Sequence, residues 1–344
     1  MNQIRFGTPF YLFLIGLLTF ILLLPSLIVI PFKNNVQQNA SPGKLEKAES
    51  EAPIVLNSEV DVSVYKTSAK KIETLPLEDY VKGVVAAEMP ADFEIEALKA
   101  QALTARTYII KMLLNPADMN LPEGADVTDA VIHQVFKNDQ ELQKAWGKDY
   151  EWKIKKITQA VKETEGKIIT YDGKPIDALF FSTSNGFTQN SEDYWSSSFP
   201  YLRSVESPWD KDSPKYFHQQ AFPIDVVESK LNVKLADGDG EIGKILSRTK
   251  GNYIDTIEIN GKKMSGKDIR VGLNLKSSDF TILRKGDEVI FQTRGYGHGV
   301  GMSQYGANGM AQDGNNYNQI VKHYYNGVEI TDTQAYTSKL TASN

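Results

Sequence analysis

The chain has 344 residues, of which 41% are hydrophobic and 24% charged, with a formal net charge of −5 and no cysteine. These proportions are typical of a folded globular protein and exclude collagen-like, disulfide-rich and grossly disordered classes. Residues 1–33 hold two bases, Arg5 and Lys33, and no acid, so the rest carries 36 bases against 43 acids, a net charge of −7. Because nucleic-acid-binding proteins are usually basic, we expect no nucleic-acid partner. The lack of cysteine excludes cysteine nucleophiles and cysteine-ligated zinc.

The N-terminal segment from Phe6 to Phe32 contains no charged residue and is rich in Leu, Ile, Phe and Val. It exceeds the roughly 20 apolar residues that cross a bilayer. A cleaved signal peptide is the alternative, but its apolar core is about 7–15 residues long and is followed by small residues at a cleavage site. We predict a retained anchor with a cytoplasmic N-terminus over residues 1–33, because Arg5 and the terminal amine outweigh Lys33. The body would then be extracytoplasmic, at the cell membrane.

The remaining chain divides by composition. Residues 34–53 are polar and mix Pro, Gly, Ser and charges, which is typical of a flexible tether. Residues 54–332 carry the patterns of a folded domain, with a small inset at 215–290, and residues 333–344 read as a polar tail. We therefore predict an α+β protein: an N-terminal transmembrane helix followed by a bilobed mixed α/β extracytoplasmic body with a small β-rich inset.

The sequence of the first half of the body predicts strands, then helices, then a hairpin. Apolar runs and alternation predict the strands, and apolar residues at helical spacing predict the helices. The turn Asp172-Gly173 is a hairpin signal. The elements are strands at Ile54–Leu56 and Val60–Tyr65, helices at about 76–88, 93–114 and 139–164, and a hairpin of Lys167–Tyr171 with Ala178–Phe181.

The inset and the C-terminal part give weaker signals. We expect strands at Ile254–Ile259, Phe280–Leu283 and Glu288–Phe291, and a helix at about 316–325. Ser265, three residues before Asp268, resembles a helix N-cap.

The most informative residue is Glu88, at the end of the first predicted helix. Leu77, Val81, Val84 and Val85 follow helical spacing, and Glu88 continues the same stripe. A carboxyl group in apolar surroundings has a raised pKa and can hold a proton near neutral pH, as a general acid requires. The alternative is a buried glutamate that only pairs with a base.

Arg106 lies within the apolar face of the second predicted helix, where an isolated charge would be very costly. We expect it to be paired, with Glu88 or with a substrate group. Gln101 borders the opposite face, whose small residues predict a helix enclosed on both sides.

Two further segments leave alternatives open. The segment Ser182-Thr-Ser-Asn-Gly186 lacks the G-x-S-x-G pattern of a nucleophilic serine, so it is a polar turn or a loop that contacts sugar. Tyr201 and other nearby aromatics could stack on sugar rings or lie in the core. In the glycine-rich run at 294–306, His298 could be a ligand, an acid–base group or a residue that only fixes the turn.

The four histidines, at positions 133, 218, 298 and 323, are dispersed and form no H-E-x-x-H motif. A zinc hydrolase is therefore not supported.

Four segments together resemble the stage II sporulation protein D family. They are VKGVVAAEMP at 81–90, EALKAQALTARTY at 96–108, FSTSNG at 181–186 and GHGVGMSQYGA at 297–307. The similarity extends over roughly residues 54–330. It implies a peptidoglycan lytic transglycosylase that cuts MurNAc–GlcNAc bonds, preferably of peptide-stripped glycan strands, leaves 1,6-anhydro-MurNAc ends and acts in forespore engulfment during sporulation.

The resemblance also implies a site and partners. The family's catalytic glutamate falls on Glu88. Arg106 and Gln101 become candidates to orient Glu88 or hold the glycan. Candidates for substrate binding are Ser182, Ser184, Asn185, Tyr201 and His298. The implied partners are the amidase stage II sporulation protein P and the membrane protein stage II sporulation protein M, on the mother-cell side of the septum.

No cofactor is needed for this chemistry. Some relatives bind zinc through cysteines and a histidine; this chain keeps His133 but has no cysteine, so we expect no metal. The alternative function is a non-catalytic glycan-binding activator or scaffold of a partner cell-wall amidase, since some relatives are described as amidase enhancers. A serine hydrolase built on Ser182 or Ser184 is a weaker third reading.

Overall fold

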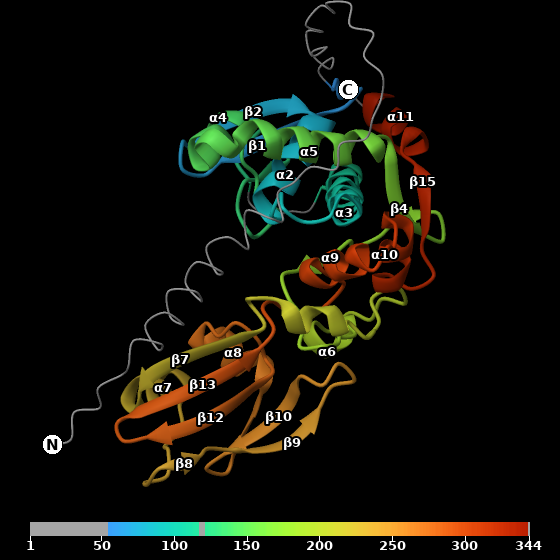
Figure 1. Cartoon of the computed structure of the whole chain (residues 1–344). Helices are drawn as coiled ribbons and strands as arrows, with labels where there is room; N and C mark the ends of the chain where they lie inside the picture. Colours follow the sequence, from blue (N-terminus) through green and yellow to red (C-terminus); the bar gives the residue numbers. More distant parts are fainter. Residues whose placement is uncertain (1–53, 117–120, 343–344) are drawn as a thin grey trace, which may run out of the picture. The chain divides into compact units, whose positions relative to one another are not determined.

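The computed structural model describes residues 54–116 and 121–342 (Figure 1). The predicted anchor (1–33) and tether (34–53) lie outside these residues. Among the helices of the described residues, none combines the length and the apolar composition that crossing a membrane requires.

The body begins with a three-stranded sheet of order β2-β1-β3. Strand β1 (Asp61–Lys66) pairs antiparallel with β2 (Lys71–Pro76) and parallel with β3 (Val127–Thr128). The strand expected at Ile54–Leu56 is wrong, because this apolar run has no ladder partner and Val55 is 64% exposed. Strand β2 was not predicted, since its sequence KIETLP offers little apolar alternation and no residue of it is buried.

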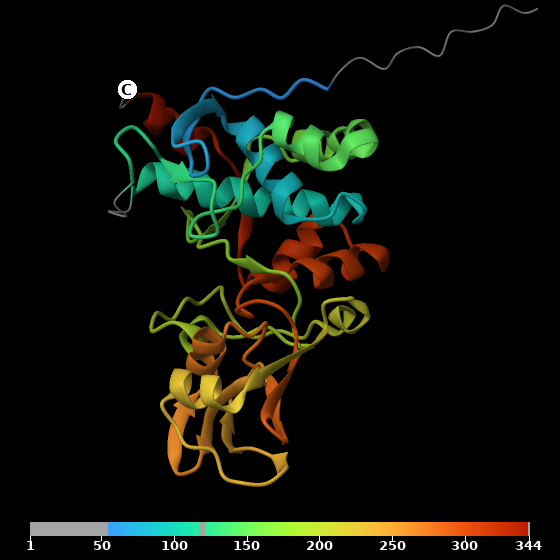
Figure 2. The same cartoon turned by 90° about the vertical axis from the view of Figure 1, so that its left-hand side faces the viewer.

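Two predicted helices follow and are confirmed. Helix α2 (Leu77–Glu88) begins after Pro76 and ends before Met89, whose conformation is extended. Pro90 accounts for that end, because the residue before a proline avoids the helical region. Helix α3 (Ile95–Leu114) packs against α2 and against α5 (Tyr150–Glu163), β4 (Lys167–Tyr171), α9 (Gln304–Gln312) and α10 (Tyr317–Tyr324). As its small residues indicate, α3 is enclosed on several sides (Figures 1 and 2).

The single helix expected at 139–164 is divided in two. Helix α4 (Asp139–Trp146) starts with a capping box between Asn138 and Glu141 and ends at Gly147, whose φ is +52°. A short 3-10 turn, η1 (Gly147–Asp149), leads into α5 (Tyr150–Glu163). Glycine adopts positive φ at no steric cost, so it breaks an otherwise continuous periodic pattern.

The hairpin signal Asp172-Gly173 is confirmed, but its second strand differs. Both residues have positive φ, and they join β4 (Lys167–Tyr171) to β5 (Lys174–Pro175). Strand β15 (Glu329–Asp332) pairs with the other edge of β4. The expected partner at Ala178–Phe181 instead contributes β6 (Phe180–Phe181), parallel to β14 (Met302–Ser303).

The inset has its own sheets, helices and hydrophobic cluster, centred on residues such as Val227, Ile269 and Phe291. The two sheets have the orders β7-β13-β12-β8 and β11-β10-β9, and α7 packs on β7 and β13. The predicted cap is present, since Ser265 Oγ accepts a hydrogen bond from Asp268 N at 2.9 Å. The elements are β7 (Phe217–Pro223), α7 (Ile224–Leu231), β8 (Gly240–Glu241), β9 (Lys244–Arg248), β10 (Ile254–Ile259), β11 (Lys262–Ser265), α8 (Gly266–Leu273), β12 (Phe280–Lys285) and β13 (Glu288–Arg294).

Helices complete the larger hydrophobic cluster around α3. Helix α10 (Tyr317–Tyr324) matches the prediction, whereas α9 (Gln304–Gln312) was missed because its two glycines weaken the helical signal. The segment expected as a polar tail from residue 333 forms α11 (Gln334–Ala342), and Tyr336 packs against the larger cluster. Short turns occur at α6 (Ser191–Tyr194) and η2 (Pro208–Asp212). The result is a mixed α/β body with two hydrophobic clusters.

Candidate functional site

Glu88 is half-buried at the last position of α2. Among the described residues, the one hydrogen bond to its carboxylate comes from Val135 N, which donates to Oε1 at 2.8 Å. Burial raises the pKa of Glu88, and the hydrogen bond from Val135 offsets only part of that rise. No basic side chain in the described part of the chain forms an ion pair with Glu88. The structure therefore does not support the alternative of a buried glutamate that only pairs with a base.

Gln304, the first residue of α9, connects Glu88 to Gln101. Its Nε2 donates to the backbone carbonyl of Glu88 at 3.1 Å and to Gln101 Oε1 at 3.5 Å. Gln101 is fully buried, and its Nε2 has no partner among the described residues. Gln101 is therefore linked to the end of α2 through Gln304, without a hydrogen bond to the Glu88 carboxylate among the described residues. Gln304 itself was missed, although it lies in one of the segments that carry the resemblance.

The loop that holds Glu88 is fastened to the middle of α2. Gln134 accepts a hydrogen bond from Tyr80 OH at 3.3 Å, and the ring of Phe136 stacks on Tyr80 with centroids 5.5 Å apart. The same loop crosses α2 at Gly83, where a β-carbon would lie 2.6 Å from Lys137 O and closer still to the Phe136 ring. This close approach places Val135 N against Glu88.

The Gly83→Ala variant is therefore expected to lose about 1–3 kcal/mol of unfolding free energy, the usual cost of overpacking. This cost exceeds the gain of up to about 1 kcal/mol from better helix propensity. Denaturant unfolding of the full chain measures it. Gly272→Ala is the matched control, because a β-carbon there meets only Leu231 at 3.7 Å. Equal stability of both variants would contradict the close approach.

The expected pairing of Arg106 with Glu88 or a substrate is wrong. Arg106 is fully buried and forms a two-point ion pair with Glu78, Nε to Oε1 at 2.8 Å and Nη2 to Oε2 at 2.6 Å. Glu78 lies ten positions before Glu88 on α2, about 15 Å away along the helix axis. The remaining guanidinium hydrogens reach the carbonyl oxygens of Val161, Thr164 and Lys167.

Tyr201 lies in the core, which is the second of its two predicted alternatives, and not at a surface that could bind sugar. Its side chain is 7% exposed and packs between the rings of Tyr171 and Phe199. The hydroxyl donates to Asp177 Oδ2 at 3.0 Å and accepts from Asp177 N at 3.1 Å. A ring this deeply buried cannot stack on a sugar.

Ser184 and Asn185 are buried and engaged in two carboxylate-centred networks. Asp210 accepts hydrogen bonds from the hydroxyls of Ser184, Ser207 and Ser303 at 2.6–2.7 Å. Asn185 Nδ2 donates to Asp279 Oδ2 at 3.2 Å. Arg248 and Arg294 complete the second network with ion pairs to Asp279 at 3.0 Å. These hydrogen bonds of Ser184 and Asn185 fix the loop, and because the Ser184 hydroxyl donates to a carboxylate, a serine hydrolase based on Ser184 has no support here.

Ser182 is half-buried and lies between two partly exposed tyrosines. Its carbonyl accepts from Tyr305 N at 3.1 Å, and the next carbonyl, of Thr183, accepts from Tyr296 N at 2.7 Å. Tyr305 follows Gln304 directly, and its ring meets Phe93 edge-on with centroids 4.9 Å apart. Ser182 and Thr183 thus join the segment after Gln304 to Tyr296, whose ring is exposed.

His298 is held in an aromatic cluster. Its ring lies 5.1–5.8 Å from those of Phe181, Tyr194 and Trp195. Burial, with the nearby Arg270, lowers its pKa to about 4. Nδ1 accepts a hydrogen bond from Val300 N at 3.1 Å, so the neutral ring fixes the glycine-rich turn. Of the open alternatives, the geometry favours this one.

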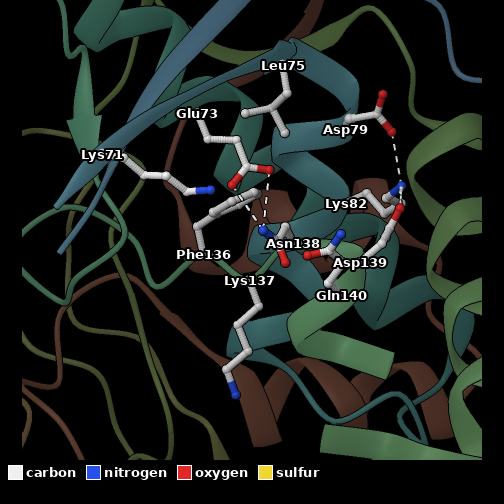
Figure 3. A pocket seen from close by; sticks show the side chains of 10 residues that line it. All are labelled: Lys71, Glu73, Leu75, Asp79, Lys82, Phe136, Lys137, Asn138, Asp139 and Gln140. Atoms are coloured by element: carbon white, nitrogen blue, oxygen red, sulfur yellow. Dashed lines mark hydrogen bonds and ion pairs between the residues drawn. The ribbon is translucent and has the colours of Figure 1, made fainter. Parts of the chain in front are cut away.

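A pocket of about 480 Å³ lies between β2, α2 and the start of α4 (Figure 3). Some of its polar groups pair with one another: Asn138 Nδ2 donates to Glu73, and Lys82 pairs with Asp79 and Asp139. Glu88 is not among its lining residues, and we assign the pocket no role in the chemistry.

No group of three or more potential metal ligands occurs among residues 54–116 and 121–342. His133 Nδ1 lies 2.9 Å from Thr128 Oγ1, so one of the two ring nitrogens of His133 already has a protein partner.

The comparison with known proteins identifies the family. The family model described as "Stage II sporulation protein" matches residues 65–171. The chain is 49% identical over 328 residues to stage II sporulation protein D of Bacillus subtilis (strain 168), covering 94% of this chain and 95% of that protein. It is 47% identical over 341 residues to the protein of the same name from Bacillus amyloliquefaciens, covering 97% and 99%.

The class defined by these matches is that of sporulation proteins. Within it, the chain belongs to the stage II sporulation protein D family. A more distant relative, the "Amidase enhancer" of Bacillus subtilis (strain 168), is 30% identical over 307 residues, covering 73% of this chain and 40% of that protein.

Proposed function

We propose that the protein is a peptidoglycan lytic transglycosylase in which Glu88 is the catalytic residue. The observation that carries this proposal is the half-buried carboxyl of Glu88, with a raised pKa and without a basic partner among the described residues. A carboxyl group whose pKa is raised keeps its proton to higher pH and can donate it to a glycosidic oxygen.

One carboxyl group suffices for this reaction, whereas ordinary glycosidases use two. Protonated Glu88 gives its proton to the oxygen of the MurNAc–GlcNAc β-1,4 bond, and that bond breaks at the anomeric carbon of MurNAc. The Glu88 carboxylate then accepts the proton of the MurNAc 6-hydroxyl as that oxygen bonds to the anomeric carbon. The product is a 1,6-anhydro-MurNAc end, and no water, metal or cofactor enters.

The hydrogen bond from Val135 N orients the carboxyl for both steps. It holds Oε1 and leaves Oε2 without a partner among the described residues. Oε2 is therefore the oxygen that we assign to proton transfer, and Gln304 fixes the end of α2 from the other side.

The cellular setting belongs to the same proposal. Residues 1–33 would anchor the chain in the cell membrane with a cytoplasmic N-terminus, and the body would act outside, on the mother-cell side of the sporulation septum during engulfment. Stage II sporulation proteins P and M would be the partners. An amidase that strips stem peptides would supply the preferred substrate.

A non-catalytic activator or scaffold of a cell-wall amidase is the second candidate. The observation that favours it is the 30% identity to a relative named "Amidase enhancer". A binding role alone does not account for an unpaired carboxyl group with a raised pKa, so we rank it below the lytic activity.

Digestion of amidase-treated peptidoglycan with the full-length chain, followed by mass spectrometry, tests the proposal. We expect muropeptides and glycan fragments ending in 1,6-anhydro-MurNAc. Reducing ends without the anhydro sugar would indicate hydrolysis and overturn the mechanism. If the chain cleaves no glycan but a partner amidase removes stem peptides faster in its presence than alone, the activator would be supported instead.

A further inference from the structure

Two lysines and two tyrosines form a strip that runs from the Glu88 region onto the inset side of the glycine-rich run. The lysine–tyrosine strip consists of Tyr305, Lys215, Tyr296 and Lys276. Lys215 Nζ lies 5.7 Å from the ring centre of Tyr305 and 5.6 Å from that of Tyr296. Lys276 Nζ lies 4.9 Å from the ring centre of Tyr296.

The strip is fixed by backbone hydrogen bonds. Ser182 and Thr183 hold the two tyrosines at 3.1 and 2.7 Å, as described above. Lys215 N donates to Ser213 Oγ at 3.1 Å, and Ser213 Oγ in turn lies 3.1 Å from Thr183 Oγ1. The carbonyl of Lys276 accepts from Gly297 N at 2.9 Å. Positions held in this way need little ordering when a ligand binds, which favours affinity.

The strip is accessible and carries uncompensated positive charge. Tyr296 is 36% exposed, Lys215 is exposed, and Lys276 and Tyr305 are half-buried. Neither lysine forms an ion pair within the described residues, although the chain beyond residue 33 has a net charge of −7. Against this acidic background, two neighbouring unpaired ammonium groups are a local anion-binding feature.

We propose that the lysine–tyrosine strip binds an acidic sugar, with its carboxylate held by Lys215 and Lys276 beside the ring of Tyr296. The inference rests on the proposed function. The chemical group that the strip would recognise is the lactyl carboxylate of MurNAc. In MurNAc, the lactyl carboxyl group is an amide while a stem peptide is attached and becomes a carboxylate when the peptide is removed. The strip thus distinguishes peptide-stripped strands by charge, in addition to any steric effect of the peptide.

Binding measured by titration calorimetry on the full chain in a Glu88→Gln background tests the inference without cleavage. The two probes are peptide-stripped glycan strands and the same strands with their lactyl carboxyl groups converted to methyl amides. Two ion pairs at the surface, each contributing up to about fivefold, lead us to expect roughly tenfold tighter binding of the free carboxylate strands. Added salt weakens that preference, because exposed charges are screened.

In the Lys215→Gln/Lys276→Gln variant, both strands are expected to bind equally within about twofold, at the level of the methyl amide strands. Lys263→Gln is the matched control, because Lys263 is an exposed lysine of the inset on β11. A preference that survives the double variant, or one that Lys263→Gln removes equally, overturns the inference.

This result is separable from the test of the lytic activity. If the unaltered chain cleaves no glycan but the carboxylate preference depends on both lysines, the lytic proposal fails and the recognition stands. If the chain cleaves glycan and the lysines do not affect the preference, the recognition alone is overturned.

Discussion

The Glu88→Gln variant is expected to lose glycan cleavage by about 10²- to 10⁴-fold, the range associated with removing a general acid–base group. Glutamine keeps an oxygen that can accept the hydrogen bond from Val135 N, so the loop at residues 134–137 keeps its place. The amide can neither donate the carboxyl proton nor accept that of the 6-hydroxyl. The measurement is the rate at which anhydro ends appear from peptide-stripped strands.

Glu94→Gln is the matched control, since Glu94 is exposed and only six positions further along the chain. It is expected to cleave at the normal rate. Normal cleavage by Glu88→Gln would exclude Glu88 as the acid, and equal losses in both variants would indicate a general charge effect.

The pH dependence follows from the raised pKa of Glu88. Only the protonated carboxyl group can act as the acid, so the cleavage rate of the unaltered chain is expected to fall as pH rises through that pKa. A profile recorded on peptide-stripped strands measures this. A rate that instead rises throughout would contradict the assignment of Glu88 as the acid.

The contribution of Glu88 to the unfolding free energy also falls as pH rises, and this supplies a control. Because the fold raises the pKa of Glu88, the stability contributed by this group is present below the unfolded pKa and is lost as pH rises through the folded pKa. Glu88→Gln lacks this loss, so at alkaline pH it should unfold no more easily than the unaltered chain. Reduced activity with full stability would then be a catalytic effect and not a folding effect.

The sequence was sufficient for features determined by local patterns. The first two helices follow from apolar spacing, and Glu88 stands out because a carboxylate occupies a position of the apolar stripe. Elements with few apolar residues, such as β2, or with internal glycine, such as the break at Gly147, depend on tertiary partners and on backbone geometry. Periodicity carries no information on either.

The sequence could not show which side chains pair with one another. Glu78 and Glu88 both lie on α2, and the pattern of α3 alone cannot decide which of them meets Arg106. Glu78 lies in the first turn of α2, where negative charge is favourable even when exposed, yet it is 2% exposed. Likewise, the sequence alone does not distinguish Tyr201 from Tyr296. In the structure the ring of Tyr201 is buried, whereas that of Tyr296 is exposed.

The buried Arg106–Glu78 pair predicts the second large effect. The Arg106→Met variant is expected to lose about 3–5 kcal/mol of unfolding free energy, because it leaves a buried carboxylate without its partner. Three carbonyl groups, at the end of α5 and the start of β4, also lose a donor. Denaturant unfolding of the full chain measures this, and Lys234→Met, which removes one partner of an exposed ion pair, should change little.

The double variant Glu78→Leu/Arg106→Met separates a structural role from a catalytic one. Replacing both partners removes the unpaired charge, so part of the lost unfolding free energy should return, and cleavage should return with it. If Arg106→Met instead unfolds normally but cleaves no glycan, Arg106 acts on the substrate or on Glu88, as its sequence position suggested. The two outcomes differ because the ion pair lies at the opposite end of α2 from Glu88, so it supports the site only through the packing of α3 against α2 and α5.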